Sequence, residues 1–149
     1  MSDPASTFIY VTYIRSTTDK VWAALTDADQ MRAYWMGAHA ESDFKPGSPW
    51  RLVFDDGRVA DAGEIVESEP GKRLVIKWRN EFKPEFKEEG WSQCVMELEE
   101  AKGAVKLTVI HSMDRPQSKF IGAVSGGWPQ ILSNLKSLLE TGQIATVAA

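Results

Sequence analysis

The 149-residue chain lacks several features that would assign it to common classes of protein. Its single cysteine, Cys94, excludes an internal disulfide and is typical of a reducing compartment. No apolar run approaches the ~18 residues of a membrane span, and the N-terminus "MSDPAST" lacks the basic and apolar parts of a secretion signal. We therefore expect a cytoplasmic protein that has no membrane partner.

An excess of positive charge is also lacking. The chain has 17 Lys and Arg against 21 Asp and Glu, a net charge of −4, and its cations form no stripe, which argues against nucleic acid as a partner. The stretch "GAVSGG" (122–127) has neither the spacing of a dinucleotide-binding loop nor a strand before it. A Gly-x-Ser-x-Gly hydrolase motif is absent from the sequence as well. We expect no cofactor.

What the sequence has in abundance is large aromatic side chains, with six Trp and six Phe. Such side chains line ligand pockets and also fill ordinary cores. The hydrophobic share of 43% and the charged share of 26% are those of a soluble globular protein, and 149 residues suit one domain. We predict a single domain over 1–149 with a core at about 7–141.

The periodicity of apolar residues predicts an α+β fold. A segment at 7–15 reads as a strand and precedes two short helices, one capped by Thr17 or Thr18 and the next beginning near Asp27 or Asp29. From there to about residue 114, apolar residues alternate in segments joined by short turns, which predicts an antiparallel meander of six or seven strands in all. A final apolar stripe at helical spacing predicts a long C-terminal helix, around which the curved sheet wraps.

The predicted C-terminal helix carries unfavourable residues at its front end. In "GGWPQILSNLKSLLETG" (126–142), Pro129 lacks the N–H that would bond to the carbonyl of Ser125, and Gly126 and Gly127 are poor helix-interior residues. We predict either a helix that continues through a kink or two segments joined at the glycines. The rear half would fill the core, and the front half would lie at a pocket mouth.

The order of elements and five stretches of sequence carry a resemblance to a known family. The stretches are "TTDKVWAALTDADQMRAYWMG", "DFKPGSPWRLVF", "GEIVESEPGKRLVIKW", "VKLTVIHS" and "GGWPQILSNLKSLLE". Together they resemble the family named for the activator of the 90-kDa heat-shock protein ATPase (the AHSA type), within the START-like (SRPBCC) superfamily. The chain departs from the usual pattern at Ser48 and Pro49, where the family often has a second Gly, and at Pro129, where it usually has another residue.

The resemblance implies the helix-grip fold, with a cavity between the concave face of the sheet and the long helix. Members of the superfamily bind apolar molecules there, and some catalyse cyclisation or hydrolysis. We expect a small apolar or aromatic ligand and no assigned reaction, because one fold hosts many functions. An enzyme acting on a small hydrophobic substrate and a chaperone-stimulating module are the alternatives. We do not expect a chaperone partner, because that role belongs to a larger protein; a homodimer is a further alternative.

Strand alternation and the helical stripe predict which side chains face the cavity. The predicted ligand-binding pocket consists of Trp35, Trp50, Phe54, Trp78, Cys94, Met96, His111, Phe120, Val124 and Trp128. A solid core built from the same side chains is the alternative.

His111 is the one candidate for catalysis. It ends an apolar strand and is either an acid/base facing a ligand or a structural histidine with a hydrogen-bond partner, and we favour the second. Carboxylates that could join His39 and His111 around a metal are Glu41, Asp43 and Asp61. No two of these ligands have the spacing of a known metal motif, so we predict no metal site. Cys94 at mid-strand is typical of a small buried hydrophobe and not of a nucleophile.

Asp61 shares the inward face of its strand with Ile65. A buried carboxylate is costly unless it is paired, which makes Asp61 a candidate site residue. We expect Asp61 at the solvent-exposed end of its strand, with pairing to Arg51 or Arg58 as the alternative.

The charged stretch "RNEFKPEFKEEG" (79–90) is predicted to be a hairpin loop. Its two phenylalanines, Phe82 and Phe86, either pack on the adjacent strands or form a lid or a dimer contact.

Overall fold

The computed structural model describes residues 5–145. In chain order the elements are β1 (Ser6–Ile14), α1 (Thr18–Thr26), α2 (Ala28–Tyr34), β2 (Ala38–Ser42), β3 (Pro49–Phe54), β4 (Val59–Glu69), β5 (Arg73–Asn80), α3 (Pro84–Lys87), β6 (Ser92–Glu100), β7 (Val105–Met113) and α4 (Lys119–Thr141).

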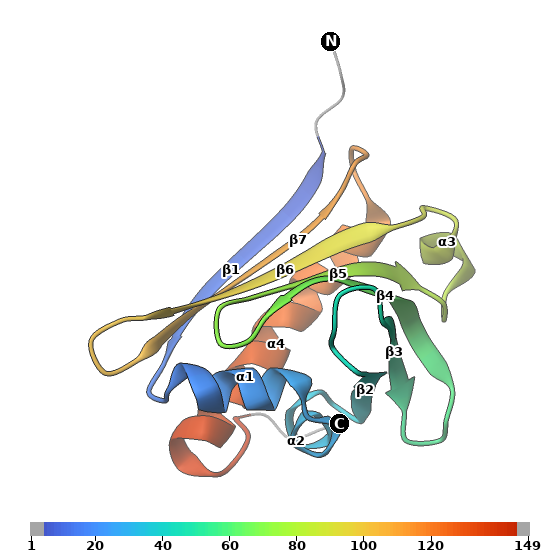
Figure 1. Cartoon of the computed structure of the whole chain (residues 1–149). Helices are drawn as coiled ribbons and strands as arrows, with labels where there is room; N and C mark the ends of the chain where they lie inside the picture. Colours follow the sequence, from blue (N-terminus) through green and yellow to red (C-terminus); the bar gives the residue numbers. More distant parts are fainter. Residues whose placement is uncertain (1–4, 146–149) are drawn as a thin grey trace.

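All seven strands belong to one antiparallel sheet in the order β1-β7-β6-β5-β4-β3-β2. Strands β2 to β7 follow one another as a meander, and β1 joins it by pairing with β7. The sheet curves around α4, and α1 and α2 lie together near one end of that helix (Figure 1). The prediction of a curved antiparallel sheet on a long C-terminal helix, with two short helices after the first strand, is confirmed.

The two short helices begin where the sequence predicts. The side chain of Thr17 accepts a hydrogen bond from the backbone N–H of Lys20 at 3.3 Å, and that of Asp27 accepts one from the N–H of Asp29 at 2.9 Å. These bonds satisfy N–H groups that a helix start leaves without partners. The apolar faces of the helices bury Val21, Ala24, Leu25, Met31 and Tyr34.

Helix α4 has defined ends. It spans 23 residues, begins after Ser118, whose Oγ accepts the N–H of Ile121 at 3.1 Å, and ends at Gly142. Gly142 has a φ of 84°, a left-handed conformation that glycine adopts without a steric cost. None of the helices in the described part of the chain is both long and apolar enough to cross a membrane.

Gly126, Gly127 and Pro129 all lie inside α4 without interrupting it. Of the two predicted alternatives, that of two segments joined at the glycines is therefore wrong, and one helix continues through this region. An interior proline costs about 3 kcal/mol, whereas burying one large apolar side chain gains about 1.5–3 kcal/mol. The apolar stripe keeps its phase across Pro129, so one helix buries Trp128, Ile131, Leu132 and Leu135 together. Their combined burial outweighs the proline.

The connection between β5 and β6 is not the plain loop predicted from its charge, because it contains the short helix α3. Pro84 at the first helical position is the local signal, since its fixed φ suits a first turn. The two phenylalanines point to different places. Phe82 is exposed and meets Phe54 edge to face, with ring centroids 5.4 Å apart. Phe86 is half-buried and meets Phe120 of α4 at 5.9 Å.

Gly63 allows two indoles to meet in the middle of the sheet. It pairs with Trp50 of β3 on one side and with Trp78 of β5 on the other. A Cβ at this position would lie 1.6 Å from the carbonyl oxygen of Lys77, so no other residue fits without moving the backbone. Because no side chain separates them, Trp50 and Trp78 pack with ring centroids 4.4 Å apart.

Candidate functional site

A pocket of about 210 Å³ lies between the front half of α4 and the concave face of the sheet, next to α3. Its lining residues are Trp35, Leu52, Asp61, Trp78, Asn80, Phe86, Phe120, Ala123, Val124, Gly127, Trp128 and Ile131. The volume exceeds the ~150 Å³ of a protein cavity that binds benzene and is below the ~300–1,000 Å³ of drug-sized sites. The pocket therefore has room for a small molecule.

Aromatic rings form most of the pocket wall. Trp35, at the C-terminal end of α2, lies 6.4 Å from Trp78 and 5.2 Å from Trp128, measured between ring centroids, and the latter two are 5.9 Å apart. All three indoles are nearly fully buried. The Phe86–Phe120 pair forms a further part of the wall. Trp35 and Trp78 are stacked and the other three pairs meet edge to face, which are favourable geometries that fix the wall in place.

Polar groups are concentrated in one part of the pocket, where one rung of the sheet places Leu52, Asp61 and Asn80 side by side. Asn80 Nδ2 donates a hydrogen bond to Asp61 Oδ1 at 3.1 Å. The amide oxygen of Asn80 accepts the backbone N–H groups of Phe82 and Lys83, at 3.1 and 2.8 Å. This oxygen is occupied by the turn into α3, so the amide must present its N–H₂ to Asp61.

Asp61 is a buried carboxyl, with 6% of its surface exposed. The expectation that it lies at a solvent-exposed strand end is wrong, and so is the alternative of pairing with Arg51 or Arg58, which pair with Glu41 and with Asp56. Burial raises the pKa of Asp61 to about 6, and the charge of Glu81 acts in the same direction. The Trp78 indole and the Asn80 amide oppose this rise in pKa.

The indole N–H of Trp78 is buried and meets no hydrogen-bond acceptor with adequate geometry in the described part of the chain. Its polarity nevertheless favours the ionised form of Asp61, because a nearby N–H dipole stabilises a carboxylate. Buried donors without a partner are rare in folded proteins. The polar part of the pocket therefore contains a buried hydrogen-bond donor, the Trp78 indole N–H, that the described part of the protein leaves without an acceptor.

His111 lies behind the pocket wall in a chain of hydrogen bonds. The Trp128 indole can only donate, and it donates to His111 Nδ1 at 3.1 Å. The proton of the neutral ring is therefore on Nε2, which donates to Ser92 Oγ at 2.8 Å, and Ser92 donates to the Trp78 carbonyl at 3.0 Å. Burial lowers the pKa of His111 to about 3. The geometry is that of a structural histidine, because both ring nitrogens have protein partners.

The structure brings together half of the predicted pocket residues. Those that line the pocket are Trp35, Trp78, Phe120, Val124 and Trp128. The other five lie elsewhere. Trp50 is behind Trp78, Phe54 packs against Phe82, and His111 lies beneath Trp78 and Phe120.

The last two predicted pocket residues, Cys94 and Met96, belong to the central core. Both are on β6, and their side chains are buried. Burial also raises the pKa of the Cys94 thiol. A thiol that stays protonated is a poor nucleophile, so the geometry around Cys94 is that of a packed hydrophobe.

A carboxylate joins the β5–β6 connection to the front end of α4. Glu89 accepts hydrogen bonds from Ser118 Oγ at 2.6 Å and from the backbone N–H groups of Lys119 and Phe120 at 2.9 and 3.2 Å. Partial burial raises the pKa of Glu89, but these bonds outweigh it and hold the pKa below its usual range. The contact keeps α3, and with it Phe86, against the pocket wall.

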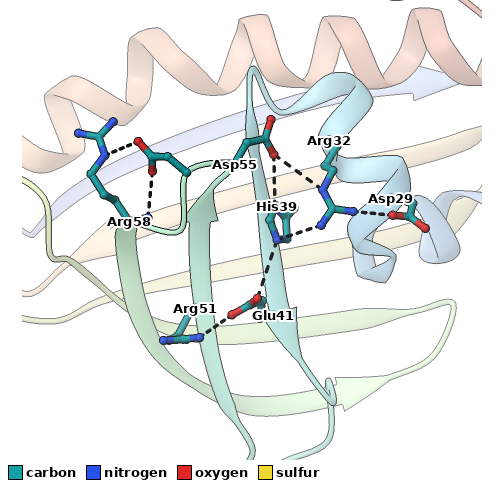
Figure 2. A network of polar contacts seen from close by, with 8 residues as sticks. Asp29, Arg32, His39, Glu41, Arg51, Asp55 and Arg58 are labelled. Carbon is teal, nitrogen blue, oxygen red and sulfur yellow. Dashed lines mark hydrogen bonds and ion pairs between the residues drawn. The ribbon is translucent and has the colours of Figure 1, made fainter.

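His39 belongs to a separate polar network that links α2, β2 and the β3–β4 turn (Figure 2). Its Nε2 lies 3.3 Å from an Arg32 guanidinium nitrogen and 3.9 Å from a Glu41 oxygen, and its Nδ1 lies 3.9 Å from an Asp55 oxygen. The positive charge of Arg32 beside His39 Nε2 disfavours binding of a metal ion to that nitrogen. Across residues 5–145, no three His, Cys, Asp or Glu side chains are placed to hold a metal.

Four residues that line the pocket were not predicted from the sequence: Leu52, Asn80, Ala123 and Gly127. Leu52 carries a periodic signal, because it alternates with Arg51 and Val53 along its strand. Asn80 could have been found from its place before the Pro84 turn, where Asn often accepts backbone N–H groups. Ala123 and Gly127 have small side chains, and a periodicity that follows large apolar residues gives them no weight.

The sheet, the gripping helix and the aromatic pocket between them define a helix-grip domain of the α+β class. The family model described as activator of Hsp90 ATPase homolog 1-like protein matches residues 15–140. The chain belongs to this family. No curated protein sequence matches the chain.

Solved structures with the same fold come from distant organisms. Protein MLL2253 from Mesorhizobium loti is 25% identical, with a TM-score of 0.77, 90% of this chain covered and 96% of that one. PFC0360w, an HSP90 activator from Plasmodium falciparum, is 23% identical, with a TM-score of 0.72 and coverages of 89% and 95%. The Aha1 dimer from Colwellia psychrerythraea is 18% identical, with a TM-score of 0.74 and coverages of 92% and 98%.

Proposed function

We propose that this domain binds a small, mainly apolar ligand in the pocket between α4 and the sheet, without catalysing a reaction. The observation that supports the proposal is the composition of the pocket, because five aromatic rings surround a space of about 210 Å³. Apolar surface of this kind gains free energy when a ligand displaces water, at roughly 25 cal/mol per Å². The ligand would contact Trp35, Trp78 and Trp128 directly.

Two adjacent glycines of α4 provide the test. Gly127 lines the pocket and Gly126 does not, and an added Cβ meets no neighbouring atom at either position. We expect Gly127→Leu to fill the pocket and to weaken binding of n-propylbenzene about tenfold or more, measured by isothermal titration calorimetry. Gly126→Leu is the matched control, because it makes the same change in the same helix, and it should leave the affinity unchanged.

Leucine is a better helix former than glycine, so both variants should keep or raise the melting temperature. Equal affinity of the wild type and Gly127→Leu for n-propylbenzene would contradict the proposal, as would no binding to the wild type. Native mass spectrometry of the purified protein gives an independent readout, since a bound ligand adds a discrete mass that Gly127→Leu should remove.

The alternatives have weaker support. An enzyme that uses His111 as acid/base would need that ring to exchange protons with a substrate, yet both ring nitrogens bond to protein groups. A chaperone-stimulating role is suggested by the family description and by the Plasmodium neighbour. Stimulation of Hsp90 ATPase by the purified domain would support that role. A homodimer is suggested by the Colwellia neighbour and is tested by light scattering.

A further inference from the structure

The polar part of the pocket holds a carboxyl for which the protein supplies no cation. Asp61 forms no ion pair with any Lys or Arg among residues 5–145. Asn80, which donates a hydrogen bond to it, and Trp78, whose indole N–H favours its ionised form, are both uncharged. Cations on the neighbouring segments are paired elsewhere, because Arg58 Nε lies 2.7 Å from an Asp56 oxygen, and Arg79 Nε lies 2.6 Å and Lys87 Nζ 3.5 Å from Glu81 oxygens. A buried carboxylate without a cation is costly, and a ligand cation would remove this cost.

The surroundings of Asp61 favour a cation over other ligand groups. Glu81 is the charged group that acts on Asp61, and its effect is that of an added negative charge. Of the other elements packed around the pocket, α3 contributes Phe86 and α4 contributes uncharged side chains. Aromatic faces attract ammonium groups, at about 0.5–2 kcal/mol for each good contact. A carboxylate beside several aromatic rings is a combination suited to an ammonium ion.

We propose that Asp61 selects the ligand by forming an ion pair with an ammonium group, so that the pocket binds small aromatic or aliphatic amines. This inference rests on the proposed function of the pocket and specifies the chemistry of its ligand. The apolar part of the amine packs against Trp35, Phe120 and Trp128, and its nitrogen lies against the Asp61 carboxylate. Asn80 holds that carboxylate in place, because its amide is fixed by the backbone of the turn into α3.

Three probes of equal size separate the contributions of charge, hydrogen bonding and apolar contact: 2-phenylethylamine, 2-phenylethanol and n-propylbenzene. They differ at one terminal group, which is ammonium, hydroxyl or methyl. By titration calorimetry at about pH 7.5, we expect the wild type to bind the amine about tenfold or more tightly than n-propylbenzene. Asp61→Asn should lower the affinity for the amine about tenfold or more and should leave that for n-propylbenzene the same or higher.

Glu64→Gln is the matched control. Glu64 is on the same strand, β4, but is exposed and does not line this pocket, so its replacement removes one negative charge without touching the site. We expect no change in the affinity of this variant for any of the three probes. An equal loss of amine affinity in Glu64→Gln and Asp61→Asn would overturn the inference, because it would indicate a general effect of net charge.

A pH profile of the wild type gives a second measurement that does not depend on a variant. The amine stays protonated below about pH 8, whereas Asp61 takes up a proton as the pH falls through about 6. We expect amine affinity to fall about tenfold between about pH 7.5 and 5, and n-propylbenzene affinity to stay constant.

The outcomes separate the inference from the proposed function. Equal binding of the amine and n-propylbenzene, or an Asp61→Asn variant with unchanged amine affinity, overturns the inference and leaves an apolar pocket. Binding of 2-phenylethanol as tight as that of the amine also overturns it, because a hydroxyl donor without charge would then suffice. Failure of all three probes to bind overturns both.

Discussion

At the scale of single residues, two buried ionisable side chains, Asp61 and His111, respond to pH in opposite directions. The raised pKa of Asp61 means that its ionised form destabilises the fold, fully above about pH 6 and not at all below the ordinary value of 3.8. The lowered pKa of His111 means that the neutral ring stabilises the fold above about pH 6.5 and that this stability is lost as the pH falls toward 3.

Removing the Asp61 charge should therefore stabilise the protein at neutral pH. We expect Asp61→Asn to raise the free energy of unfolding by on the order of 2 kcal/mol at pH 7, because the amide can still accept the bond from Asn80 and needs no counterion. Urea denaturation at pH 7 and pH 4 measures the effect, and the gain should shrink at the lower pH. A variant less stable than the wild type at pH 7 would contradict this prediction.

The contribution of His111 is best isolated in the Asp61→Asn background, where the opposing titration is absent. In that background we expect the free energy of unfolding to fall by about 2 kcal/mol between pH 7 and pH 5, because the unfolded state binds a proton that the buried ring does not. Adding His111→Gln should abolish most of this slope, since a glutamine amide can bond to Trp128 and Ser92 but does not titrate. If the pH dependence of the unfolding free energy persisted in the double variant, a group other than His111 would be its source.

At the scale of elements, the short connection between β5 and β6 controls how the pocket is covered. Helix α3 reaches the wall through Phe86, and the carboxylate of Glu89 holds the connection against three donors at the start of α4. A negative charge at a helix N-terminus is favourable because unpaired N–H groups and the helix dipole meet there.

Glu89→Gln tests this attachment. We expect the free energy of unfolding to fall by about 1 kcal/mol at pH 7. The loss is small because Glu89 is partly exposed and solvent screens its charge. The pKa of Glu89 is lowered in the fold, so its contribution is present above about pH 4.5 and disappears as the pH falls further. Glu88→Gln is the control, because Glu88 is adjacent to Glu89 in the chain but its side chain is exposed and makes no such contacts. Faster amide exchange at 81–91 in Glu89→Gln alone would show local release, and equal exchange in both variants would argue against it.

Most elements were predictable from the sequence, and the exceptions have physical causes. Caps at Thr17 and Asp27, strand alternation and the helical stripe are local signals, so the fold followed from them. The pocket was harder, because alternation gives the face of a side chain and not its depth. Cys94 and Trp128 both face inward, yet one is packed in the core and the other lines a space. The partner of Asp61 depends on strand register, which a single sequence does not specify.

At the scale of the whole molecule, one hydrophobic core joins the sheet to α1, α2 and α4. Residues from all these elements contact one another, so none of them should unfold alone. We expect a two-state thermal transition in which the calorimetric enthalpy equals the van 't Hoff enthalpy. A ratio well above one in differential scanning calorimetry, or a separate early transition of α4, would contradict this prediction.

The absence of a side chain at Gly63 has an optical consequence. Because Trp50 and Trp78 lie 4.4 Å apart, and Trp78 is also near Trp35 and Trp128, the excited states of these indoles are shared between rings. Coupled transition dipoles give a paired positive and negative band in circular dichroism whose shape depends on the angle between the rings. Since three of the four indoles line the pocket, a small tilt of one ring would change that band. The domain therefore contains its own chromophore at the site, and no attached dye is needed to observe its occupancy.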